Sequence, residues 1–306
     1  MLMGVLLPEQ AFAWGPGVHM VTGNWILQNL SVLPLPVSAA LMLHPGQFLH
    51  GSLSADIFIG KGCRPKKGHS HNWESGFALL GRAETPQQRS YAYGYLAHLA
   101  ADTVAHNVFV PGLAHTIPAK GKMAHVYLEI QADRLLSWDS SDAVGVFHER
   151  SSRKAAAMLR ATMRQRTLSF WLKTRLFESS VALGGSRAWR GSLRVLDSLV
   201  PGHERSALLD RMLTLSTRAI VNLLQEGEAS PVLTLDPIGA EALANAEKHG
   251  RDGLLAQSLA TRFKRVLPGA PRNAAPTPEG EPALTIPVPP VLETFPPVCT
   301  SDGMIR

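Results

Sequence analysis

The stretch YAYGYLAHLAADTVAHNVFVP, residues 91–111, decides the fold class. Its apolar residues recur at helical intervals, which predicts a helix over 87–108. Three potential metal ligands, His98, Asp102 and His106, interrupt this run at steps of four. Because four residues advance a helix by about 400°, the three side chains form one slowly drifting stripe. Two imidazoles and a carboxylate in that arrangement can converge on a cation such as zinc.

Helical spacing continues over most of residues 17–265, and the strict alternation typical of strands is nearly absent. We therefore predict an all-α protein, a multi-helix bundle. Prolines, glycines and a charged break at 61–67 separate the predicted helices. These helices cover 17–30, 36–44, 71–83, 87–108, 119–137, 140–165, 168–179, 185–199, 203–226 and 238–265.

The composition indicates one globular domain with a different segment at each end. Hydrophobic residues make up 45% of the chain and charged residues 18%, as in a folded protein, and residues 14–265 form the predicted helical domain. Residues 266–306 hold ten prolines and no Trp or Tyr, so we expect an extended, disordered tail. The chain has no run of 18 apolar residues, which argues against a transmembrane segment.

The first thirteen residues, MLMGVLLPEQAFA, are typical of a secretory signal segment. A short apolar core is followed by an A-x-A cleavage site, but the usual basic residues before the core are missing, so a truncated signal segment is one interpretation. We expect cleavage before Trp14 and a secreted or periplasmic protein.

A second pair of potential ligands lies in KMAHVYLEIQADRL, where His125 and Glu129 are also four residues apart. A single His on an apolar face is more often a core residue held by a hydrogen bond. Nine of the twelve histidines, however, lie at or before residue 125. Burying several ionisable groups without a cation is costly, so the set as a whole favours metal binding.

Five motifs in order resemble the zinc-dependent phospholipase C superfamily. This superfamily includes bacterial phospholipases C, the N-terminal domain of glycosylphosphatidylinositol-specific phospholipase D and, more distantly, the S1/P1 nucleases. The resemblance covers roughly residues 14–135, and the motifs are WGPGVH, LSADIFIG, HNW, HLAADTVAH and AHVYLE. It implies an all-helical fold with three zinc ions, in which the freed amine and the carbonyl of an N-terminal Trp are ligands.

Position by position, the resemblance implies three sets of ligands. Trp14, His19 and Asp102 would hold one zinc, with Asp102 as a bridging carboxylate. Asp56, His71, His98 and the same Asp102 would hold a second zinc. His106, His125 and Glu129 would hold the third.

Some of these assignments stay open. His106 lies four residues after Asp102, and this spacing matches the phospholipase D branch. The other members usually have a His six residues after the bridging Asp, where this chain has Val108. The W-x4-H spacing of Trp14 and His19 is instead that of the nucleases. His115 is an alternative to His106, and His69 is an alternative to His71.

The function that the resemblance implies is hydrolysis of a phospholipid phosphodiester by metal-activated water, with Asp56 as both ligand and catalytic group. The alternatives are an S1/P1-like nuclease and a non-catalytic, secreted zinc-binding protein. SFWLKTRLF, residues 169–177, has two interpretations. It is either an interfacial helix for peripheral membrane contact or, as we favour from sequence, a core helix with two basic residues outward.

Overall fold

The computed structural model describes residues 14–58, 69–113, 122–149, 152–164, 167–184 and 203–242. Every regular element in these ranges is helical, which confirms the predicted all-α class. The α-helices are α1 (Pro16–Gln28), α2 (Leu35–Leu43), α3 (Pro45–Ser54), α4 (Trp73–Gly81), α5 (Pro86–Val104), α6 (Val110–Leu113), α7 (Lys122–Leu135), α8 (Ser140–His148), α9 (Ser152–Thr162), α10 (Thr167–Gly184) and α13 (His203–Glu226). The expected signal segment, the Pro-rich tail and the predicted helix at 185–199 lie outside the described residues, as does nearly all of 238–265.

Short helical turns connect some of these helices. Four are 3-10 turns, namely η1 (Leu30–Val32), η2 (Ala55–Ile57), η5 (Gly227–Ala229) and η6 (Pro231–Thr234). The fifth, η3 (Ala105–Phe109), is a π-helical turn that joins α5 directly to α6. The helix predicted at 87–108 therefore continues to Leu113. Single π turns inside α-helices are frequent at functional sites, and this one contains His106.

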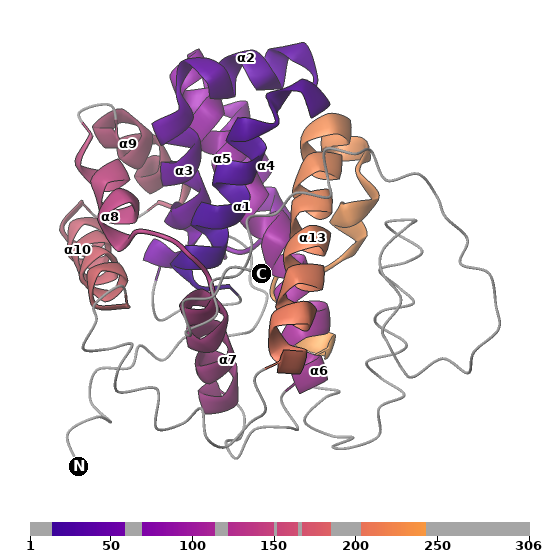
Figure 1. The fold of residues 1–306 in the computed structure, drawn as a ribbon. Helices are drawn as coiled ribbons and strands as arrows, with labels where there is room; N and C mark the ends of the chain where they lie inside the picture. The colour runs from indigo at the N-terminus through magenta and orange to yellow at the C-terminus, as the bar shows by residue number, and fades with distance from the viewer. Residues whose placement is uncertain are drawn as a thin grey trace.

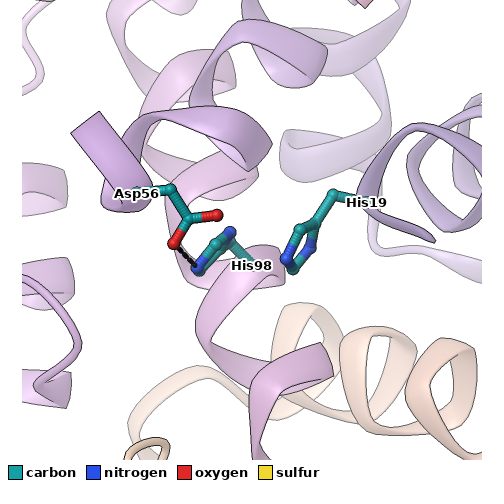
Figure 2. A group of neighbouring side chains, drawn as sticks. All are labelled: His19, Asp56 and His98. Carbon is teal, nitrogen blue, oxygen red and sulfur yellow. Dashed lines mark ion pairs between the residues drawn. The ribbon is translucent and has the colours of Figure 1, made fainter. Parts of the chain in front are cut away.

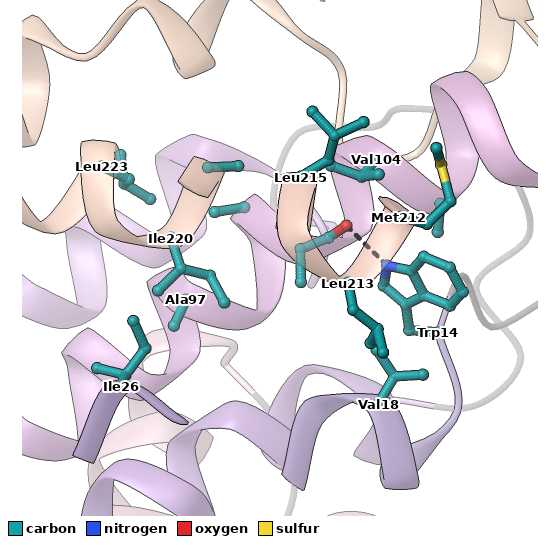
Figure 3. Close-up of a cluster of buried hydrophobic side chains, with 14 of the residues drawn as sticks. Trp14, Val18, Ile26, Ala97, Val104, Met212, Leu213, Leu215, Ile220 and Leu223 are labelled. Carbon is teal, nitrogen blue, oxygen red and sulfur yellow. Dashed lines mark hydrogen bonds between the residues drawn. The ribbon is translucent and has the colours of Figure 1, made fainter. Parts of the chain in front are cut away.

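Helix α5 is the central element of the bundle, with α3, α4 and α13 packed around it (Figure 1). A capping box between Thr85 and Gln88 and a proline at the first position fix its start. Its two sides join two separate hydrophobic clusters. Tyr91 and Leu99 pack with residues from η2 and α10, whereas Ala101 packs with α1 and α13 (Figure 3). Because both sides are covered, the polar side chains of α5 are enclosed as well.

Helix α3 is missing from the predicted set of helices, and its contact with α5 explains why. Its sequence PGQFLHGSLS contains residues that weaken an isolated helix, Gly51 among them. A Cβ added to Gly51 would lie 2.0 Å from the carbonyl oxygen of Tyr91, and one added to Gly94 would lie 2.0 Å from that of Phe48. The two glycines allow the backbones of α3 and α5 to touch. The packing of the two helices therefore requires glycine at positions where helix propensity disfavours it.

The single helix predicted over 140–165 is wrong, since α8 ends at His148 and α9 begins at Ser152. Glu149 leaves the helical region with ψ of 139°, and its side chain accepts a 3.5 Å hydrogen bond from Gln47 of α3. In the part of the chain that the structure describes, we find no helix with the length and apolarity needed to span a bilayer.

Candidate metal centre

Five ionisable side chains from four separate segments meet beside the middle of α5. They are His19 of α1, Asp56 of η2, His71 just before α4, and His98 and Asp102 of α5. Figure 2 shows how three of them, His19, Asp56 and His98, point toward one another. All are buried except His71, whose side chain is 13% exposed. The cluster therefore reaches solvent on the side of His71.

Four of these residues present one ligand atom each to a common point. Nε2 of His71 lies 3.1 Å from Oδ1 of Asp56 and 3.4 Å from Oδ2 of Asp102. Nε2 of His98 lies 3.6 Å from Oδ1 of Asp56 and 3.1 Å from Oδ2 of Asp102. The two Nε2 atoms are 3.2 Å apart. Ligand atoms about 2.0–2.1 Å from a tetrahedral zinc are separated by about 3.3 Å, so the spacing of His71, His98 and Asp102 fits one zinc ion, with Asp56 beside the two imidazoles.

Asp102 faces two groups of ligands with its two oxygens. Oδ2 lies against His71 and His98, whereas Oδ1 is 3.4 Å from Nε2 of His19. The rings of His19 and His98 stack with their centroids 4.0 Å apart. This is the geometry of a carboxylate that bridges two cation positions.

A hydrogen bond sets the orientation of the His98 ring. Nδ1 of His98 donates to the carbonyl oxygen of Ser52 at 2.8 Å, which turns Nε2 toward the cluster, where it offers a lone pair to a cation once the ring is neutral. Among the described residues, Oδ2 of Asp56, both oxygens of Asp102 and Nε2 of His19 have no hydrogen-bond partner although they are buried. Buried carboxylates and imidazoles of this kind are stable when they coordinate a cation.

The charges in the cluster shift several pKa values. Burial lowers the pKa of His98, but Asp102 and Asp56 outweigh burial and raise it to about 9. Burial raises the pKa of Asp102, but His98 and His19 outweigh this and hold it well below the usual range. For His19 burial dominates, so its pKa is lowered. Asp102 thus remains anionic in a buried site and attracts positive charge.

The third predicted set of ligands is described only in part. His106 is buried in the π turn, where Nδ1 donates to the carbonyl oxygen of Pro237 at 2.6 Å. Burial lowers the pKa of His106, and the negative charge of Asp102 partly opposes this shift. His106 is therefore close enough to the cluster to interact electrostatically with Asp102. Glu129 is buried on α7. His125 lies one turn earlier on α7, but its side chain is outside the described residues, as is all of His115.

Trp14 is fully buried beside α5. Its indole Nε1 donates to the carbonyl oxygen of Ala101 at 3.0 Å, the bond dashed in Figure 3, and to Oγ of Ser216 at 3.1 Å. Ala101 immediately precedes Asp102, so the indole fixes Trp14 beside the turn of α5 that carries Asp102.

The remaining histidines near the N-terminus take other positions. Nδ1 of His69 accepts the backbone N–H of His71, and the two ring centroids are 5.8 Å apart, so His71 rather than His69 lies in the described cluster. His50 is buried in the core against the rings of Tyr91 and Phe147. His44 is half-buried at the start of α3.

Two supporting contacts come from groups outside the predicted ligand set. Asp133 of α7 accepts the N–H groups of Gly17 and Val18 at 2.9 and 3.0 Å, and so caps the helix that carries His19. The start of α1, Gly-Pro-Gly, offers no capping side chain of its own, which is a signal that a cap must come from elsewhere. The second feature is the carbonyl of Pro237, which is a backbone group and leaves no trace in the sequence.

A family model described as zinc dependent phospholipase C matches residues 18–178, more than half of the 306-residue chain. None of the curated proteins and none of the solved structures matches the chain. The matched range contains His19, Asp56, His71, His98 and Asp102.

Proposed function

The chain belongs to the zinc-dependent phospholipase C family, and from this premise we propose that it hydrolyses phospholipid phosphodiester bonds with zinc held at the described cluster. The observation that carries the proposal is the spacing of 3.1–3.6 Å that joins the Nε2 atoms of His71 and His98 to each other and to the carboxylates of Asp56 and Asp102. Ordinary core packing offers no reason for four ionisable groups to meet at one point in a buried site.

We propose that the protein holds three zinc ions. Asp56, His71, His98 and Asp102 would hold the first. His19 and Asp102, together with the amine and carbonyl of Trp14 after cleavage, would hold the second. His106, His125 and Glu129 would hold the third. The split orientation of the Asp102 carboxylate supports the first two, and the burial of His106 and Glu129 agrees with the third.

Zinc bound at such a site supplies Lewis acidity, which lowers the pKa of water and neutralises charge on a phosphate. The protein contributes the position of the reactants. Asp56 has one buried oxygen, Oδ2, that is not used in the described hydrogen bonds, and this atom can accept a proton from water. The water oxygen then bonds to phosphorus, the ester P–O bond breaks, and the departing oxygen takes up a proton from solvent. The substrate phosphate approaches along the side of His71, where the cluster is exposed.

We also propose that the protein acts outside the cytoplasm after cleavage between Ala13 and Trp14. The A-F-A sequence before Trp14 supports this, and a mature N-terminal Trp would provide the amine that an internal residue lacks. Sequencing the N-terminus of the protein recovered from culture medium or periplasm tests the proposal. A secreted protein that still begins at Met1 would contradict it.

The decisive assay compares p-nitrophenylphosphorylcholine, phosphatidylcholine vesicles and single-stranded DNA as substrates for the purified, zinc-loaded chain. We expect hydrolysis of the first two, and analysis of the phosphate in the products assigns C-type or D-type cleavage. Turnover of DNA alone would favour an S1/P1-like nuclease. Zinc bound without turnover of any phosphodiester would favour a non-catalytic zinc-binding protein.

A further inference from the structure

Helix α10 presents large apolar side chains to solvent along most of its length. Leu168, Trp171, Leu172, Leu176 and Leu183 are 77%, 55%, 51%, 55% and 63% exposed. Four of them, the leucines, follow one another at steps of four, four and seven, so they lie on one side of the helix. We call these five residues the outer face of α10.

The opposite side of the same helix is a core face. Phe170, Phe177 and Val181 are buried in the hydrophobic cluster that includes residues of η2. The sequence favoured a core helix whose basic residues point outward. The structure gives a core face and, in addition, an exposed apolar face, so burial in the core does not account for the leucines.

The core face of α10 holds the helix close to the metal centre. Helix α10 packs against η2, the turn that contains Asp56. The rings of Phe58 and Phe170 are 5.9 Å apart, which joins the residue next to Trp171 with a residue two positions after Asp56. A surface bound by the outer face would therefore be held in a defined position relative to the cluster.

The charges on α10 suit an anionic or zwitterionic lipid surface. Its basic residues are Lys173 and Arg175, and the guanidinium of Arg175 lies 6.0 Å from the ring centre of Trp171. Its single acidic residue, Glu178, is 11% exposed and paired with Arg175 and His148. Leucines and a tryptophan flanked by basic residues are typical of helices that lie in a membrane interface.

From these observations we propose that the outer face of α10 docks the protein onto a phospholipid surface. This inference rests on the proposed function for its substrate. It goes further by assigning the membrane contact to one helix and one face.

Flotation of the full chain with vesicles tests the proposal at 4 °C, where hydrolysis is slow. The vesicles contain phosphatidylcholine and phosphatidylglycerol in a ratio of about 7:3. We expect wild type to float with the vesicles, and a Leu172→Glu/Leu176→Glu variant to bind at least ten-fold more weakly. The matched control is Met42→Glu/Leu43→Glu on α2. These two residues are 66% and 62% exposed at the far end of the bundle from α10 (Figure 1).

We expect the control to bind within two-fold of wild type, and both variants to retain the wild-type circular dichroism and rate on p-nitrophenylphosphorylcholine. Wild type that stays unbound would overturn the proposal, as would an equal loss in both variants. Sedimentation velocity provides a further check, because a wild-type dimer that the α10 variant dissociates would make this face an interface between two copies. Failure of the proposed function would instead leave vesicle binding intact while abolishing hydrolysis of every substrate.

Discussion

Gly51 of α3 and Gly94 of α5 bring the backbones of the two helices into direct contact, because a Cβ on either would lie 2.0 Å from a carbonyl oxygen of the other helix. Ser52, whose carbonyl orients His98, follows Gly51 directly, and Asp56 follows at the end of the same segment. The crossing therefore sets the separation between Asp56 and His98.

Replacing Gly94 with Ala is expected to lower the free energy of unfolding by about 3 kcal/mol or more, because backbone atoms rather than flexible side chains meet the new methyl group. Urea denaturation measures this loss, and the bound zinc should fall with it. Gly145→Ala is the matched control, since it lies in α8 with open space around it. That change is expected to stabilise the protein by about 0.5–1 kcal/mol. Wild-type stability of Gly94→Ala would show that the helices do not touch there.

Asp102→Asn is expected to remove two zinc ions per chain from the purified protein. The carboxylate faces His19 with one oxygen and His71 and His98 with the other, so its replacement by an amide weakens two positions at once. Metal content by mass spectrometry is the measurement, and Asp142→Asn, an exposed acidic residue of α8, is the control. A variant with unchanged zinc content would refute the bridging role.

His50 is expected to make the fold sensitive to acid. Burial between Tyr91 and Phe147 lowers its pKa from the ordinary 6.5 to about 3. The unfolded chain therefore takes up a proton below pH 6.5 while the folded chain does not, so stability falls as the pH drops from 6.5 toward 3. At pH 5 this loss is roughly 2 kcal/mol from His50 alone.

The difference between wild type and His50→Phe isolates this effect from that of the other histidines. The loss of unfolding free energy between pH 7 and pH 5 should be smaller in the variant than in wild type by roughly 2 kcal/mol. Parallel pH profiles for the two proteins would mean that His50 is protonated in the folded state.

Asp133→Ala is expected to cost about 2 kcal/mol of stability, because two N–H groups at the start of α1 lose a charged acceptor. Helix α1 carries His19, so zinc affinity should fall as well. Asp139→Ala removes an exposed cap of α8, where the side chain accepts one N–H group, and it provides the comparison. We expect it to cost about 1 kcal/mol and to leave zinc binding unchanged. Equal zinc loss in both variants would argue against a specific link between α7 and His19.

The sequence predicts those parts of the fold and site that depend on local pattern. His98 and Asp102 share one side of a helix by spacing alone, and that helix is present. His19, Asp56 and His71 lie far from α5 in the chain, and only the resemblance to a family groups them with it. Helix α3 was missed because Gly51 is chosen for a contact with α5 and not for helix formation. The support of His106 by Pro237 joins residues 131 positions apart, which no short pattern records.

The anchoring of Trp14 by its indole has a consequence for maturation. The two hydrogen-bond partners of the ring nitrogen, Ala101 and Ser216, follow Trp14 in the chain, so a cut before Trp14 leaves both bonds in place. Precursor and mature chain can therefore share one bundle and differ at this point by a single nitrogen. In the uncut chain the backbone nitrogen of Trp14 is an amide, and its lone pair is delocalised. After the cut it is a free amine, whose lone pair can bind a metal ion. Proteolysis would then switch the chemistry of one atom without any change of shape.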